Sequence, residues 1–112
     1  MEKMKYRNTL QKGSARYIIF REGNTWYGTC LEFNIVESGD TPREANLLLL
    51  EAMQGYVESV RKLKARPHIL NQKSDPEYER MWGAAQARRK IPSKEIFSFG
   101  TLNLSRRAFA AV

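Results

Sequence analysis

The stretch "CLEFNIVESGDTPREANLLLLEAM", residues 30–53, decides the fold, because it encodes a strand end, a turn and a helix start in succession. The segment TPRE is typical of a capping box. In such a box the Thr41 hydroxyl accepts from the amide of Glu44, and the Glu44 carboxylate reaches back to the amide of Thr41. Proline suits the first helical position, where its missing N–H would have no partner. We therefore assign a structural role to the residues of this helix start: Gly39, Asp40, Thr41, Pro42 and Glu44.

The helix is predicted to run from Thr41 to about Leu63 and to have two apolar sides. A broad stripe at helical spacing is expected to be buried: Ala45, Leu48, Leu49, Ala52, Met53, Tyr56, Val60 and Leu63. A narrower patch consists of Leu47, Leu50 and Val57. One sheet cannot cover both sides, so the patch is expected to meet the C-terminal part of the chain or a second subunit. Gly55 in mid-helix suggests close packing at that point.

Two strands before this helix form a predicted hairpin. The segments 15–21 and 25–33 are rich in aromatic and β-branched residues, and Gly23-Asn24 between them tolerates the positive φ of a tight turn. A third short strand is expected at 35–38. In the second strand, the more apolar alternating set is assigned to the core face: Tyr27, Thr29, Leu31 and Phe33.

The C-terminal half is predicted to hold a connector, a helix that starts near Asp75 and Pro76, and a strand at 96–104. The expected fold class is α+β, with a three-stranded antiparallel meander packed on one long helix (β-β-β-α), followed by a second helix and a C-terminal strand. The chain is expected to have three parts: a basic N-terminal arm (1–14), the β-β-β-α unit (15–63) and the segment 64–112. This last segment is expected to complete the sheet or to exchange with a second subunit.

Charge is distributed unevenly along the 112 residues, whose net charge is +7. Residues 1–21 carry six basic groups and one acidic group, residues 22–60 one basic and seven acidic, and residues 61–112 twelve basic and four acidic. Opposite blocks suit either self-association or an acidic partner such as nucleic acid. No apolar run approaches the ~18 residues of a membrane span. We expect a cytoplasmic protein that does not contact the membrane.

Residues able to carry out catalysis are few, and we expect neither an enzyme nor a cofactor. His68 is the only histidine and Cys30 the only cysteine, so no histidine pair or cysteine cluster can form. Nothing next to Cys30 in the sequence would lower its pKa. Three carboxylates near one strand end (Glu32, Glu37 and Asp40) could hold Mg²⁺, but the helix start already gives Asp40 a role. No catalytic or metal-binding residues are assigned.

The basic C-terminal half has the composition of a nucleic-acid-binding surface. Arginines next to aromatic residues suit phosphate contact and base stacking. The candidate contacts are Arg88, Arg89, Lys90, Arg106 and Arg107. The same residues equally suit an ordinary core with a solvated basic rim. Both interpretations stay open at this stage.

Residues 15 to about 62 resemble the HicB family of antitoxins from type II toxin–antitoxin pairs. An aromatic pair in the second strand matches Trp26-Tyr27, and the strand end that follows matches Cys30-Leu31-Glu32. A glycine-polar-threonine turn then enters a helix with a Glu-Ala pair, matched by Gly39, Asp40, Thr41, Glu44 and Ala45. The match covers a little under half of the chain.

This resemblance implies a β-β-β-α unit akin to a double-stranded-RNA-binding fold. It also implies a non-enzymatic, antitoxin-like protein that binds a partner, namely a small mRNA-cleaving toxin of the HicA type. We expect a homodimer or a higher homo-oligomer as well, because of the patch Leu47, Leu50 and Val57. The alternatives are a nucleic-acid-binding module that uses the basic N- and C-terminal arms, and a diverged stand-alone domain with another partner.

Overall fold

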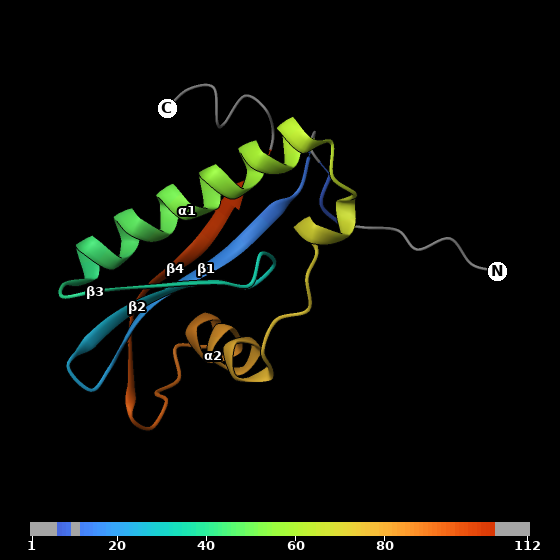
Figure 1. Cartoon of the computed structure of the whole chain (residues 1–112). Coiled ribbons are helices and arrows are strands. Elements are labelled where there is room, and N and C mark those ends of the chain that lie inside the picture. The colour runs from blue at the N-terminus through green and yellow to red at the C-terminus, as the bar shows by residue number, and fades with distance from the viewer. Residues whose placement is uncertain (1–6, 10–11, 105–112) are drawn as a thin grey trace.

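The computed structural model describes residues 7–9 and 12–104, which form a four-stranded antiparallel sheet and two α-helices (Figure 1). The strands are β1 (Ser14–Glu22), β2 (Thr25–Cys30), β3 (Ile35–Gly39) and β4 (Lys94–Asn103), in the spatial order β3-β2-β1-β4. The helices are α1 (Pro42–Leu63) and α2 (Pro76–Gln86), with a short 3-10 helix, η1 (Pro67–Leu70), between them. The α+β class expected from the sequence is confirmed.

Strand β4 lies at an edge of the sheet and pairs with β1 of the same chain, from Ser14 opposite Asn103 to Glu22 opposite Lys94. The sheet thus has four strands rather than three. Within this single chain, the C-terminal strand completes the sheet. It begins two residues earlier than the predicted start at Ile96.

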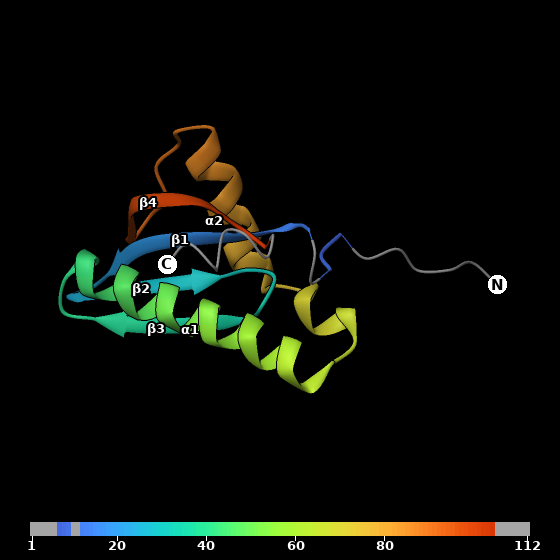
Figure 2. The same ribbon diagram turned by 90° about the horizontal axis from the view of Figure 1, so that it is seen from above.

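The two helices cover opposite faces of the sheet, α1 on one side and α2 on the other (Figure 2). Successive side chains of a strand point to opposite faces. In β1, Ile19 accordingly packs in the cluster that contains Leu49 of α1, whereas Ile18 and Phe20 pack with Met81 of α2. The central strand is apolar on both sides because both sides are buried.

The prediction of a single core face on the second strand was therefore wrong. Tyr27 and Leu31 belong to the cluster of α2, while Cys30 and Phe33 belong to the cluster of α1. Phe33 changes sides because β2 ends at Cys30, and a turn with Asn34 at φ 58° redirects the chain. The alternation therefore ends before Phe33.

The start of α1 is close to the predicted capping box. The Thr41 hydroxyl accepts from the amide of Glu44 at 3.0 Å, and Pro42 is the first helical residue. The Glu44 carboxylate accepts from the amide of Asp40 at 3.1 Å, one residue before the predicted partner. These bonds satisfy amides that a helix start leaves without intrahelical partners.

The buried side of α1 differs from the prediction. It consists of Ala45, Leu49, Met53, Val57 and Val60. Val57 is thus a core residue, 1% exposed, and cannot belong to an outward patch with Leu47 and Leu50. Leu48 and Leu63, which we expected to be buried, are 38% and 78% exposed. Gly55 does not mark close packing, since a Cβ there would meet nothing within 4 Å.

Candidate interaction surfaces

The first candidate surface, called the α1 surface below, lies on the solvent side of the first turns of α1. A shallow groove of about 380 Å³ is lined there by Thr41, Arg43, Glu44, Leu47, Leu48 and Glu51. Leu47 is 55% exposed, because a helix packed on a sheet through residues 45, 49 and 53 turns residue 47 outward. Of the predicted patch, Leu47 lies on this surface, Leu50 is half-buried, and Val57 is in the core.

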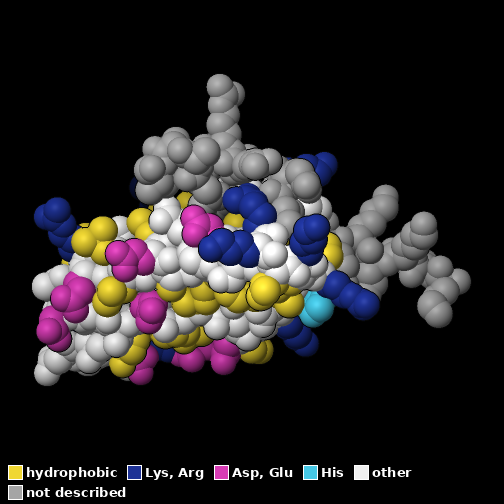
Figure 3. Space-filling model, turned by 45° about the horizontal axis from the view of Figure 1, so that its top comes forward, with side chains coloured by type: hydrophobic (Ala, Val, Ile, Leu, Met, Phe, Trp, Pro, Cys, Tyr) yellow, Lys and Arg dark blue, Asp and Glu magenta, His cyan; other side chains and the backbone are white. Residues whose placement is uncertain are grey.

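Acidic groups surround these exposed leucines. Glu44 and Glu51 flank them, Asp40 is exposed just before the helix, and Arg43 is the cation among the lining residues. In Figure 3 the acidic side chains gather toward the end of the molecule at which α1 begins. The surface is therefore apolar at its centre and mainly negative around it.

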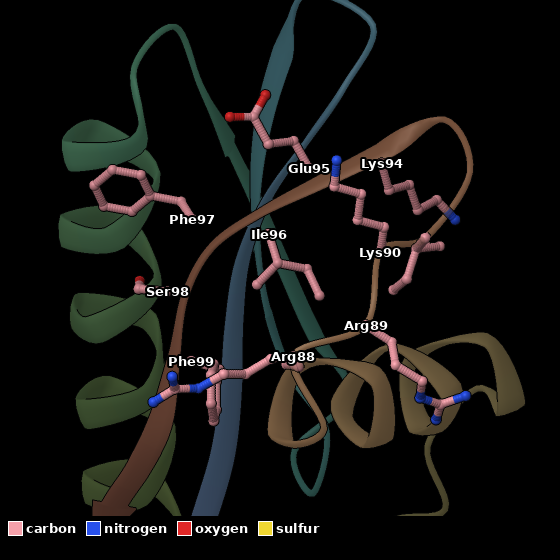
Figure 4. A pocket seen from close by; sticks show the side chains of 11 residues that line it. Arg88, Arg89, Lys90, Lys94, Glu95, Ile96, Phe97, Ser98 and Phe99 are labelled. Atoms are coloured by element: carbon pink, nitrogen blue, oxygen red, sulfur yellow. The ribbon is translucent and has the colours of Figure 1, made fainter.

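The second candidate surface, called the basic groove below, lies between the end of α2 and β4. It has a volume of about 690 Å³, and it is lined by Ala85, Arg88, Arg89, Lys90, Ile91 and the β4 residues 94–99 (Figure 4). The structure thus brings three predicted nucleic-acid contacts, Arg88, Arg89 and Lys90, to one groove. The other two, Arg106 and Arg107, lie outside the described residues.

The groove has an excess of positive charge. Its carboxylate, Glu95, pairs with Arg21 at 2.5 Å, and its fourth cation, Lys94, is held by Glu77 and Glu22. The side chains of Arg88, Arg89 and Lys90 are exposed, and none forms an ion pair within the described part of the chain. Three positive charges therefore face the solvent.

Two phenyl rings of β4 add apolar surface to this groove. Phe97 is 60% exposed and Phe99 is 43% exposed. Each ring makes an edge-to-face contact with a tryptophan: Phe97 with Trp26 at 5.8 Å and Phe99 with Trp82 at 5.5 Å between ring centroids. The rings are held in place and remain accessible.

A bulge in β4 separates the two rings. Ile19 pairs with Ser98 but the next residue of β1, Phe20, pairs with Ile96, so Phe97 is an extra residue in the ladder. Its ring meets Trp26 on the α1 side, whereas Phe99 meets Trp82 of α2. The sequence alternation of β4 gave no sign of this bulge, because bulges depend on the partner strand.

The backbone positions the three cations of the groove. Helix α2 ends at Gln86. Arg88 adopts the left-handed conformation with φ 56°, so the chain leaves the helical path at this residue. Ser93 is also left-handed, with φ 66°, just before β4. The connector that contains these two residues lines the groove with residues 88–90.

Three of the residues considered for catalysis or metal binding, Cys30, His68 and Glu32, lie in different surroundings. Cys30 is buried, and burial raises the pKa of its thiol to about 12, so the thiol stays protonated at neutral pH. His68 lies exposed on η1. Glu32, a predicted Mg²⁺ candidate, pairs instead with Arg16 at 2.6 Å. Among the described residues no group of three or more His, Cys, Asp or Glu side chains is placed to hold a metal ion.

Arg16 forms a network that the sequence did not suggest. Its guanidinium donates to Glu32 at 2.8 Å and to both oxygens of Glu79 at 2.8 and 2.7 Å, and it lies 5.7 Å from the centre of the Trp82 ring. Glu79 also accepts from the hydroxyl of Ser74. These contacts connect β1, the turn after β2 and helix α2. Pairs 16 and 63 residues apart cannot be read from local sequence patterns.

Comparisons with known proteins do not assign this chain to a family: neither the family models, nor curated proteins, nor solved structures give a match. Within the described residues, no helix has the length and hydropathy needed to cross a membrane.

Proposed function

We propose that this protein is a non-enzymatic, HicB-like module that binds another protein through the α1 surface. The observation that carries the proposal is the pair of neighbouring leucines, Leu47 and Leu48, exposed to 55% and 38% next to Glu44 and Glu51. A central apolar contact with a charged rim is the usual anatomy of a protein–protein interface.

Charge favours a basic partner. Residues 22–60, which include this surface, carry seven acidic groups and one basic group. A protein that binds and cleaves mRNA needs positive charge to hold phosphates. A small toxin of the HicA type, the partner expected from the HicB resemblance, therefore fits the α1 surface in charge, and the protein would act in an antitoxin-like way by covering it.

The expected homodimer is less favoured at this surface. Two copies joined by a two-fold axis place the same patch against itself. Both copies would then bring Glu44 and Glu51 into one interface, and the excess of like charges there opposes association. A basic partner would place opposite charges, rather than like charges, against Glu44 and Glu51.

Light scattering of the purified chain measures the mass of the particle in solution. A dimer that persists at all concentrations would have to form through a different interface or neutralise these carboxylates.

The proposal is tested by capturing binding partners of this chain from lysate and then rebuilding the complex from purified proteins. Proteins retained from nuclease-treated lysate of the source cell are identified, and the pair is then rebuilt from two purified proteins. We expect a small basic protein that forms a defined complex with the wild-type chain. The double variant Leu47→Lys/Glu51→Lys should weaken that complex by about 30-fold or more, since it removes an interface anchor worth about 2 kcal/mol and opposes a basic partner.

A matched control lies on the same helix. Glu58→Lys/Ser59→Lys changes the charge by the same amount at two exposed positions that do not line the α1 surface. This variant should bind with close to wild-type affinity. Equal weakening by both double variants, or no reconstituted complex at all, would contradict the proposal.

A second candidate function is nucleic-acid binding, and one specific observation favours it. Three exposed cations and two exposed phenyl rings line one groove, on residues separate from the α1 surface. The two candidate functions therefore make separate predictions for different variants.

A further inference from the structure

We infer that the basic groove binds the phosphodiester backbone of a single-stranded nucleic acid, with bases placed on the exposed phenyl rings of β4. This inference rests on the second candidate function and is independent of the α1 surface. Its starting point is the position of Arg88, Arg89 and Lys90 around one groove with Phe97 and Phe99 (Figure 4).

Charge indicates an anionic ligand. The ion pairs of Lys94 and Glu95 leave Arg88, Arg89 and Lys90 as the cations of the groove without a described ion pair. Three exposed cations on consecutive residues make the groove positive, and an anion that binds there neutralises this charge. Guanidinium groups also match the oxygens of a phosphate in a two-point geometry.

The aromatic rings select among anionic ligands. Phe97 and Phe99 are too exposed to serve only as core residues. Phe99 contacts Trp82 of α2 and lies beside Arg88 (Figure 4), whereas Phe97 contacts Trp26 on the α1 side of β4. A base that is free to leave its stack can lie on such a ring, which contributes about 1–3 kcal/mol per base. In a duplex the bases are already stacked in the interior, so the rings favour a single strand.

Size and shape agree with this ligand. The groove is an open depression of about 690 Å³ rather than a closed cavity. Phe99 meets Trp82 on the α2 side, whereas the extra residue Phe97 meets Trp26 on the α1 side, so the two rings offer separate platforms on either side of the β4 edge. A flexible strand can follow the edge and use both platforms, whereas a rigid duplex cannot.

Fluorescence polarisation with the full chain tests the inference. The probes are a labelled 12-nucleotide single-stranded RNA of uridines, the matching DNA of thymidines, a 12-base-pair duplex and an Asp/Glu-rich peptide of equal charge. Three phosphate contacts predict that single-strand affinity falls about 20-fold between 50 and 200 mM salt. The variant Arg88→Gln/Arg89→Gln/Lys90→Gln should lose most of the affinity at low salt and most of this salt dependence.

Two further variants make the result specific. Lys62→Gln/Arg66→Gln/Lys73→Gln removes three exposed cations outside the groove and should bind nearly as the wild type does. Phe97→Ala should weaken binding about fivefold or more with the salt dependence unchanged, because a base loses its platform. Circular dichroism of each variant checks folding, and the triple glutamine variants change only exposed side chains.

Several outcomes would overturn the inference. Equal losses in the groove variant and its control would show that net charge alone binds the probe. Duplex affinity equal to single-strand affinity would remove the role of the rings. Binding of the acidic peptide with no binding of the oligonucleotides would assign the groove to a protein ligand instead.

Discussion

Arg16 joins the sheet to α2, since its guanidinium pairs with Glu32 in the turn after β2 and with Glu79 of α2. The side chain of Glu32 is only 15% exposed, and it would lose its charge partner in the variant Arg16→Met. We predict a loss of about 1–3 kcal/mol in the free energy of unfolding, because a largely buried carboxylate without its partner retains its desolvation cost. Urea denaturation measures this, and an unchanged midpoint would show that the network contributes nothing.

The same contact makes a prediction about pH. The hydrogen bond from Arg16 lowers the pKa of Glu79 below its usual value of 4.5. A lowered folded-state pKa means that this stabilisation is complete above pH 4.5 and is lost as the pH falls through the folded value. The stability difference between wild type and Arg16→Met should therefore shrink below pH 4.5. A difference that stays constant down to pH 3 would contradict this.

Cys30 provides a test of burial in the α1-side core. Because burial raises the pKa of its thiol to about 12, thiolate is scarce in the folded protein at pH 8. A chromogenic disulfide reagent should react very slowly with the native chain and at once in 6 M guanidinium, as unfolding removes both the burial and the pKa shift. Rapid stoichiometric labelling of the native chain would mean that this core opens readily.

At the scale of elements, the contact between α1 and the sheet depends on Gly28. A Cβ at this position would lie 3.0 Å from the Cβ of Leu49 and 3.1 Å from the carbonyl oxygen of Ala45. Gly28→Ala should cost about 1–3 kcal/mol, because the helix must move away from β2. Gly55→Ala is the control within α1: it meets nothing within 4 Å and should stabilise by about 0.5–1 kcal/mol. Thermal unfolding of both variants measures these changes in stability. A Gly28→Ala variant more stable than Gly55→Ala would exclude this packing.

Local chemistry explains which elements could be predicted. The start of α1 followed from four adjacent residues, and Asp75 with Pro76 gave the start of α2, where the Asp75 carboxylate accepts from the amide of Glu77 at 2.8 Å. The covering of both sheet faces could not be predicted, since it depends on where α2 packs. Val57 was misplaced for the same reason: helical spacing gives a stripe but not its exact orientation against the sheet.

At the scale of the whole molecule, the opposite charge blocks of the sequence become two separate surfaces. The acidic block contributes the α1 surface, and the basic block contributes the groove between α2 and β4. The sequence predicted Arg88, Arg89 and Lys90 as a group because they are consecutive. It did not predict the groove that they line, because the groove depends on how α2 packs on the sheet beside β4.

The most direct measurement is a paired binding assay that uses one variant for each surface. Wild-type protein, Leu47→Lys/Glu51→Lys and Arg88→Gln/Arg89→Gln/Lys90→Gln are each titrated with the reconstituted basic partner and with the single-stranded oligonucleotide. We expect the α1 variant to lose the protein partner and keep the oligonucleotide, and the groove variant to do the reverse. Loss of the protein partner in the groove variant, with binding intact in the α1 variant, would contradict the assignment of the protein-binding surface to α1.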